Sequence, residues 1–174
     1  MARPGRIIVH TGDGKGKTTA ALGTALRASG HGLKTAIVQF IKGGGWDYGE
    51  ARALDACAGI ELTRIGSGFT WQADDPDEPR SRAREAWEAA CNAAMSDTYD
   101  LLILDELNCA IVEGYVAVDE VLSLLDKRPQ RLSVILTGRG APLELIDRAD
   151  TVTEMRCIKH AFSEGIPARK GIEY

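Results

Sequence analysis

Short apolar runs alternate along this chain with stretches whose apolar residues recur at helical spacing. Continuous apolar runs typical of buried strands occupy residues 7–9, 35–41, 101–104 and 132–136, and residues 60–65 alternate as in a half-buried strand. Helical spacing occurs in residues 20–26, 80–96, 118–125 and 142–149. Continuous apolar strands separated by helices are typical of a mostly parallel sheet with helices on both faces. The pattern therefore predicts an α/β fold.

A glycine-rich segment follows the first strand and reads Thr-Gly-Asp-Gly-Lys-Gly-Lys-Thr-Thr over residues 11–19. A strand, a glycine-rich loop and a helix start, in this order, are the context of a P-loop, which holds a polyphosphate. Glycines let successive backbone N–H groups point at the phosphates, and the helix N-terminus adds partial positive charge. Lys17 is expected to reach the terminal phosphates, and the Thr18 hydroxyl to sit on a magnesium ion. The predicted nucleotide-binding residues are Gly12, Asp13, Gly14, Lys15, Gly16, Lys17, Thr18 and Thr19.

This loop departs from the usual P-loop pattern at one position. The pattern G-x-x-x-x-G-K-[ST] places a glycine five residues before Gly16, but that residue is Thr11 and the glycine is Gly12. A phosphate cradle of different shape is therefore expected. The alternative, a merely flexible Gly/Lys-rich turn, is disfavoured by the strand before it and the helix after it. The fold class that follows is P-loop NTPase-like (RecA-like), as one domain over residues 1–174.

Two acidic residues, Asp105 and Glu106, directly follow the apolar run 101–104. This pattern is typical of the strand that organises magnesium in P-loop proteins, because it delivers carboxylates to the edge of the sheet beside the phosphates. Many strands end in an acidic residue that only solvates a turn. The pattern therefore indicates a metal site here because the chain also contains a P-loop motif. It predicts a metal site formed by Thr18, Asp105 and Glu106, and the spacing does not decide which carboxylate contacts the metal directly.

No motif supplies a general base or a nucleophilic side chain. His10, His31 and His160 are scattered along the sequence, and each is interpreted as a solvated or satisfied histidine. This pattern is consistent with a substrate that brings its own nucleophile. Phe69 and Trp71 lie in a glycine-flanked loop, where aromatic rings either anchor the loop to the domain or face a flat ligand.

Composition limits the classes of protein that remain. The 174 residues are 44% hydrophobic and 26% charged, which is ordinary for a globular domain, and the net charge of -4 provides no basic field for nucleic acid. The four cysteines form no C-x-x-C pair, so buried, reduced thiols in a cytoplasmic protein are expected rather than a metal or disulfide framework. No run approaches membrane-spanning length, and residues 1–6 lead into the first strand without room for a signal peptide.

Several motifs, taken in order, resemble those of the ATP:corrinoid adenosyltransferases of the CobA/CobO/BtuR type. The resemblance spans nearly the whole chain, and the shifted first glycine is the normal form in that family. The motifs lie at residues 11–21, 68–71, 104–108, 137–142, 158–162 and 170–174.

The resemblance implies transfer of the 5′-deoxyadenosyl group from ATP to the cobalt of a reduced, cob(I) corrinoid, with release of triphosphate. It implies that Lys17 acts on the phosphates, and that Glu106, with Thr18, coordinates Mg²⁺ or Mn²⁺. Phe69 and Trp71 match the family aromatics that crowd the lower face of the corrin and displace its axial ligand. Lys17, Phe69 and Trp71 are therefore the predicted catalytic residues. Implied partners are a flavoprotein or flavodoxin as electron donor and a second subunit in a homodimer, with no nucleic acid and no membrane.

Two other functions fit parts of the pattern: a P-loop ATPase or kinase that transfers the terminal phosphoryl group, and a RecA-like nucleic-acid-binding module. The acidic balance weighs against the second. Some relatives carry an N-terminal extension thought to cover the partner subunit's active site. We expect that lid to be missing or replaced here, because few residues precede the first strand.

Overall fold

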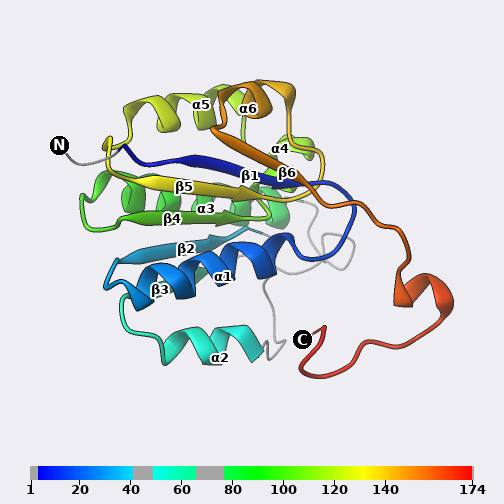
Figure 1. The fold of residues 1–174 in the computed structure, drawn as a ribbon. Coiled ribbons are helices and arrows are strands. Elements are labelled where there is room, and N and C mark those ends of the chain that lie inside the picture. Colours follow the sequence, from blue (N-terminus) through cyan, green and yellow to red (C-terminus); the bar gives the residue numbers. More distant parts are fainter. Residues whose placement is uncertain (1–3, 41–48, 66–76, 174) are drawn as a thin grey trace.

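The computed structural model describes residues 4–40, 49–65 and 77–173, and they form an α/β fold around one sheet (Figure 1). Every strand pairing in that sheet is parallel, and the spatial order is β3-β2-β4-β5-β1-β6. The P-loop NTPase-like fold class predicted from the sequence is confirmed. The strands are β1 (Ile7–Thr11), β2 (Thr35–Gln39), β3 (Ile60–Arg64), β4 (Leu101–Asp105), β5 (Ser133–Thr137) and β6 (Thr151–Glu154).

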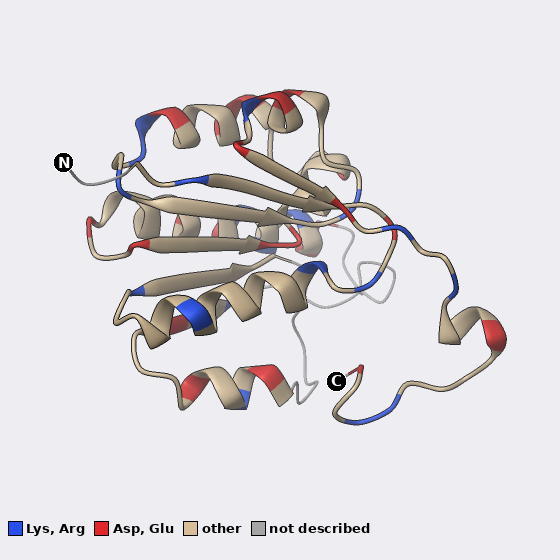
Figure 2. Cartoon of the chain, viewed as in Figure 1, with Lys and Arg blue, Asp and Glu red and all other residues tan. Residues whose placement is uncertain are grey.

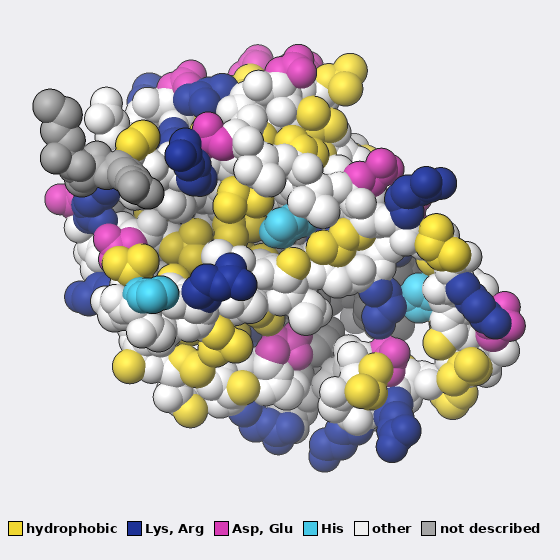
Figure 3. All heavy atoms as spheres, in the orientation of Figure 1, with side chains coloured by type: hydrophobic (Ala, Val, Ile, Leu, Met, Phe, Trp, Pro, Cys, Tyr) yellow, Lys and Arg dark blue, Asp and Glu magenta, His cyan; other side chains and the backbone are white. Residues whose placement is uncertain are grey.

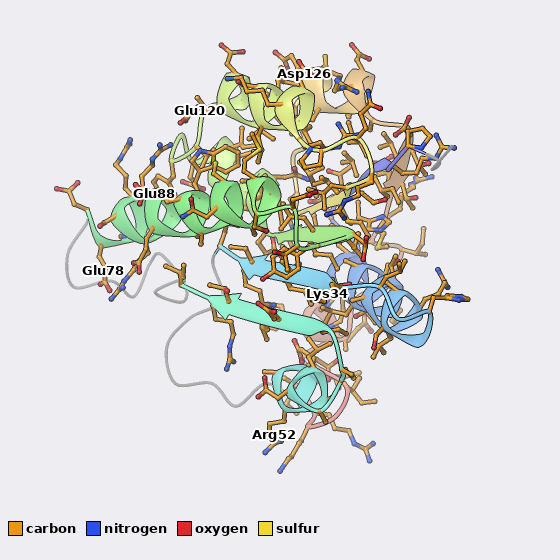
Figure 4. All side chains as sticks on the ribbon, turned by 90° about the vertical axis from the view of Figure 1, so that its left-hand side faces the viewer. Lys34, Arg52, Glu78, Glu88, Glu120 and Asp126 are labelled. Carbon is orange, nitrogen blue, oxygen red and sulfur yellow. The ribbon has the colours of Figure 1, made fainter. Side chains whose placement is uncertain are left out.

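Helices cover both faces of the sheet, which Figure 4 shows from its amino edge. α1 (Lys17–Gly30) and α2 (Gly49–Asp55) pack on one face. The other face carries α3 (Glu78–Met95), α4 (Leu107–Val112), α5 (Val118–Lys127) and α6 (Leu143–Arg148).

The alternation of side chains along each strand produces the two halves of the core. Ile37, Ile103 and Ile135 face α1 and α2, whereas their neighbours in the sequence, such as Leu104 and Leu136, face the other helices. All five residues of β2 and of β4 are buried, because both faces of these central strands are covered. Burial on both faces is why the central strands appear in the sequence as continuous apolar runs.

The sequence pattern missed three short elements, α2, α4 and β6. The two helices span seven and six residues, too few for helical periodicity to be visible. β6 reads Thr-Val-Thr-Glu, and all four of its residues are exposed at the edge of the sheet, so it lacks the apolar signal of a core strand. β2 also ends at Gln39, two residues before the predicted end at residue 41.

Two expectations about single residue types can be compared with the structure. Cys157 is exposed, and the other three cysteines are half-buried, so the prediction of buried thiols is wrong for Cys157. The Nδ1 atom of His10 is buried, and no described residue forms a hydrogen bond with it. The residue as a whole is only partly buried, which is compatible with the solvated or satisfied histidine expected. Burial also lowers the pKa of His10, which favours its neutral imidazole at pH 7.

A tail of residues 155–173 leaves the sheet after β6 and extends away from the body of the domain (Figure 1). It contains one 3₁₀ turn (Ala161–Glu164), and it exposes apolar and basic side chains together (Figure 3). Near its end, the Glu173 carboxylate lies 3.7 Å from the Lys15 ammonium. The tail therefore returns to the glycine-rich loop. Among the described helices, none is long and apolar enough to cross a membrane.

Candidate active site

The predicted site residues gather at the carboxyl edge of the sheet, where the arrowheads of the strands point in Figure 1. The glycine-rich loop follows β1, Asp105 is the last residue of β4, and Glu106 comes directly after it. β5 lies between these two strands and pairs with both, so the turn after β5 stands between the loop and the acidic pair. In open parallel sheets this is the edge where ligands bind. Figure 2 shows basic residues at the start of α1 and along the tail beside this edge.

The first turn of α1 is suited to binding an anion. Its N-cap residue is Gly16, which has a φ of 113° and no side chain that could cap the helix. The first turn also contains no acidic residue. The first N–H groups of a helix have no partner within the helix, and the helix dipole places partial positive charge there. The N-terminus of this 14-residue helix is therefore open to a phosphate group.

Lys17 folds its side chain over the glycine-rich loop. Its ammonium nitrogen donates hydrogen bonds to the carbonyl oxygens of Gly12, at 2.6 Å, and Gly14, at 2.8 Å. The residue is 7% exposed, which is rare for a lysine. An ammonium group has three donors, so one remains for a ligand while the other two shape the loop.

The structure explains why the first glycine of the motif stands at residue 12. Thr11 is buried, and its hydroxyl accepts a hydrogen bond from the backbone N–H of Ala141 at 3.1 Å. Gly12 has a φ of 89°, and a Cβ there would lie 2.5 Å from the carbonyl oxygen of Met155. The Thr11 side chain thus forms a hydrogen bond with the backbone, whereas residue 12 has no room for a Cβ atom.

One N–H group of the predicted cradle is already hydrogen-bonded within the protein. The N–H group of Gly14 does not point at a phosphate site, because it donates to the carbonyl oxygen of Met155 at 2.6 Å. The space beside Gly14 is also filled, since a Cβ there would lie 2.8 Å from the backbone of Arg156. This part of the loop is therefore fixed to the segment after β6. The donors left for phosphates are those nearer the start of α1.

Asp105 is fully buried and connects three elements at the site. Its Oδ1 atom accepts hydrogen bonds from the hydroxyls of Thr18, at 2.9 Å, and Thr137, at 2.7 Å. Its Oδ2 atom accepts one from the Gln39 amide at 3.0 Å. Thr18 is therefore oriented by Asp105. Sequence reasoning missed Gln39 and Thr137, and the available signal was a polar residue at the end of a buried strand.

Glu106 adopts a left-handed backbone conformation, with a φ of 63°, which is uncommon for a residue with a side chain. Its N–H donates to the Thr137 hydroxyl at 3.0 Å, and its Oε2 atom accepts a hydrogen bond from the Cys109 thiol at 3.0 Å. Burial, together with the charge of Glu106, raises the pKa of Cys109 to about 12. The thiol is thus protonated near neutral pH and can serve as the donor to this carboxylate.

The residues present suit a small, hard cation. Thr18, Asp105 and Glu106 offer only oxygen atoms, which Mg²⁺ prefers, and Mg²⁺ usually binds one or two carboxylates together with substrate phosphates. In residues 4–40, 49–65 and 77–173, no group of three or more histidine, cysteine or acidic side chains could hold a metal without other ligands. The site therefore fits a magnesium ion that is completed by a bound polyphosphate.

The other predicted residues divide into two groups. Asp13, Lys15 and Thr19 are exposed at the same edge, where the Asp13 carboxylate lies 3.9 Å from the guanidinium of Arg139. Phe69 and Trp71 lie outside the described residues. The structure thus brings Lys17, Thr18, Asp105 and Glu106 to one edge and leaves the two aromatics as predictions.

Comparison with known proteins extends over almost the whole chain. Residues 3–174 match the model of the family described as ATP:corrinoid adenosyltransferase BtuR/CobO/CobP. Corrinoid adenosyltransferase of Escherichia coli strain K12 is 44% identical over 170 residues, which cover 98% of this chain and 86% of that protein. Corrinoid adenosyltransferase CobA of Salmonella typhimurium is 43% identical with the same coverage. The corrinoid adenosyltransferase of Pseudomonas aeruginosa is 42% identical, over 98% of this chain and 84% of that protein.

Proposed function

We propose that this protein, which belongs to the BtuR/CobO/CobP family of ATP:corrinoid adenosyltransferases, transfers the 5′-deoxyadenosyl group of ATP to cob(I) cobalt and releases triphosphate. Membership in the family makes the protein a transferase that adenosylates corrinoids. The observation that carries the finer proposal is the open N-terminus of α1 beside Lys17, which suits a polyphosphate leaving group. ATP, the cob(I) state and triphosphate are the parts that the experiments below test.

The proposed reaction requires little proton transfer by the protein. Cob(I) cobalt is a strong nucleophile with no proton to remove, so the step needs no general base. Catalysis then consists of holding the 5′-carbon in line with the cobalt and stabilising charge on the departing triphosphate. Lys17 and the first turn of α1 are suited to the second task.

We assign the metal ligands by the hydrogen bonds of the two carboxylates. Both oxygens of Asp105 accept hydrogen bonds, one of them from Thr18, so Asp105 would orient Thr18. Glu106 is less buried and would hold Mg²⁺, or Mn²⁺, together with Thr18. A bound magnesium ion would neutralise part of the triphosphate charge.

The proposal extends to the partners and setting of the enzyme. Cob(I) requires a strong reductant, so a flavoprotein or flavodoxin is proposed as electron donor, in the reducing environment of the cytoplasm. A homodimer is proposed from the family resemblance. Residues 1–174 are proposed to be a single domain, because all six strands of the described part belong to one sheet.

The first test identifies the inorganic product. Protein, magnesium-ATP and chemically reduced corrinoid are incubated, and the light-sensitive cobalt–carbon bond is followed by absorbance. We expect triphosphate to accumulate in step with the alkylated corrinoid, measured by phosphorus NMR. A dominant ADP signal would contradict the proposal and favour a kinase or an ATPase.

The second test concerns Phe69 and Trp71, which we propose help to form the nucleophile. A lower axial ligand pushes electron density onto cobalt(II) and opposes its reduction, and two bulky apolar side chains beneath the ring would exclude that ligand. Phe69→Ala and Trp71→Ala are therefore expected to slow adenosylation strongly when it starts from cob(II) and a biological reductant. The same variants should lose much less when cob(I) is supplied by strong chemical reduction. Equal losses in both assays would restrict the two aromatics to binding or folding.

A further inference from the structure

The turn after β5 is fixed in place on two sides. Gly138, with a φ of 129°, packs so closely that a Cβ there would lie 3.0 Å from the Cβ of Asn108 on α4. The Asn108 amide also donates to the carbonyl oxygen of Gly138 at 3.1 Å. Gly140, with a φ of 67°, leaves only 2.9 Å between such a Cβ and the side chain of Val112. On the other side, the N–H of Ala141 donates to Thr11 of β1.

Between these two glycines stands Arg139, the one residue of the Gly-Arg-Gly turn that carries a side chain. Its Nε atom lies 3.9 Å from the Asp13 carboxylate in the glycine-rich loop. The turn that carries Arg139 follows β5, which pairs with both β1 and β4, so it stands between the glycine-rich loop and the acidic pair.

The pairing of Arg139 with Asp13 leaves most of the guanidinium available. The two side chains are 68% and 84% exposed, and an exposed pair at this distance contributes little to stability. A guanidinium has five N–H donors in a planar fork that matches carboxylate and phosphate groups. Within the described ranges, the structure shows no other ion pair or hydrogen bond of this side chain. A rigid turn thus presents a weakly paired cation beside the phosphate loop.

We propose that Arg139 binds the triphosphate and acts as a catalytic residue, exchanging Asp13 for phosphate oxygens when the nucleotide binds. This inference rests on the proposed function. As the cobalt–carbon bond forms, cobalt supplies the electron pair, the bond between C5′ and its ester oxygen breaks, and that pair moves onto the triphosphate. Negative charge therefore grows on the triphosphate during the reaction. A guanidinium placed there stabilises the transition state more than the ground state.

A simpler role for Arg139 would be to neutralise Asp13, whose carboxylate would otherwise repel the phosphates. The two roles differ in what happens when Asp13 loses its charge. If Arg139 only neutralises Asp13, Asp13→Asn should restore the Arg139→Ala variant. If Arg139 contacts the phosphates, the double variant should stay impaired.

The matched control is Arg148→Ala. Arg148 is another partly exposed arginine in an ion pair, 2.8 Å from Asp126, which Figure 4 labels on α5. It lies at the end of α6, two residues before Asp150, whose carboxylate accepts a hydrogen bond from the N–H of Ile7 at the start of β1. This is the edge of the sheet opposite the active site.

Two measurements are made on the full chain of each variant. Calorimetric titration with magnesium and inorganic tripolyphosphate gives the affinity for the leaving group without any corrinoid. Single-turnover adenosylation, with chemically reduced cob(I) and saturating ATP, gives the rate of transfer.

Arg139→Ala should weaken tripolyphosphate binding by about tenfold or more, the loss expected for a charge-assisted hydrogen bond. It should also slow transfer by about a hundredfold, as does removal of one preorganised contact to developing charge. Arg139→Lys should recover only part of either loss, because lysine lacks the planar fork. Arg148→Ala should match the unsubstituted protein.

Restoration of Arg139→Ala by Asp13→Asn, or equal behaviour of Arg139→Ala and Arg148→Ala, would overturn the inference. These failures differ from failure of the proposed function. If the unsubstituted protein forms no cobalt–carbon bond while tripolyphosphate binding still depends on Arg139, the adenosyl-transfer proposal fails and the phosphate site stands. If Arg139→Ala binds tripolyphosphate and transfers adenosyl at full strength, the function stands and the role of Arg139 fails.

Discussion

Replacing Lys17 with alanine is expected to lower the rate of adenosyl transfer by about a hundredfold or more at saturating ATP. Lys17 is 7% exposed, and its ammonium is directed by the carbonyl oxygens of Gly12 and Gly14, so it is preorganised before the nucleotide arrives. Its charge is expected to act on the departing triphosphate, and its loss should lower kcat more than it raises KM for ATP. Single-turnover kinetics with chemically reduced corrinoid measure the change.

Two further variants separate the lost charge from a disturbed loop. Lys17→Met removes the charge but keeps most of the buried aliphatic stem, and it should be impaired as strongly as the alanine variant. Lys127→Ala removes an exposed lysine from the last turn of α5 and should leave the rate unchanged. Normal turnover by Lys17→Met would contradict the assignment of this loop as the triphosphate site.

Glu106→Gln and Asp105→Asn are expected to fail in different ways, because the two carboxylates have different surroundings. Glu106→Gln should raise the magnesium concentration for half-maximal rate by about a hundredfold, the upper end of the loss when a partner of a metal ligand is removed. Excess magnesium should restore much of its rate. Asp105→Asn should lose about ten- to a hundredfold in rate, and excess magnesium should restore little of it, because loss of the carboxylate charge weakens the hydrogen bond that orients Thr18 while the direct ligand Glu106 is kept.

Rates measured across a magnesium titration distinguish the two cases. Asn in place of Asp105 keeps the volume and one acceptor oxygen, but its NH2 group replaces an oxygen that accepts a hydrogen bond, either from Gln39 or from Thr18 and Thr137. Melting temperatures of both variants show whether this mismatch unfolds the domain. If Asp105→Asn shifts the magnesium dependence and Glu106→Gln does not, the assignment of the direct ligand is reversed.

The sequence predicted the parts of this site that local patterns encode. Lys17 and Thr18 follow from a loop whose spacing is set by the phosphates, and Asp105 and Glu106 follow from acids after a buried strand. Gln39 could not be predicted, because its amide meets Asp105 only when β2 and β4 pair in register. The same holds for Thr137, which reaches Asp105 from β5.

The apolar sequence patterns that reflect burial were also weaker for strands at the edge of the sheet. The central strands β2 and β4 stand out because both faces are covered, but β6 has no such coverage and its four exposed residues resemble a loop. The position of the Gly14 N–H likewise depends on Met155, a residue 141 positions later that only the folded chain brings to the loop.

The place of β1 in the sheet has a consequence for the order in which the protein is made. Among the strands that the structure describes, β1 pairs with β5 and β6 alone, so in the chain leaving the ribosome the strand that precedes the glycine-rich loop waits for partners more than 120 residues away. Pairings between such distant segments close large loops and form late in folding. The first strand synthesised is thus among the last to find its neighbours. The glycine-rich loop then reaches its final shape only when most of the chain has emerged, so the proposed nucleotide would bind the finished fold and not a nascent one.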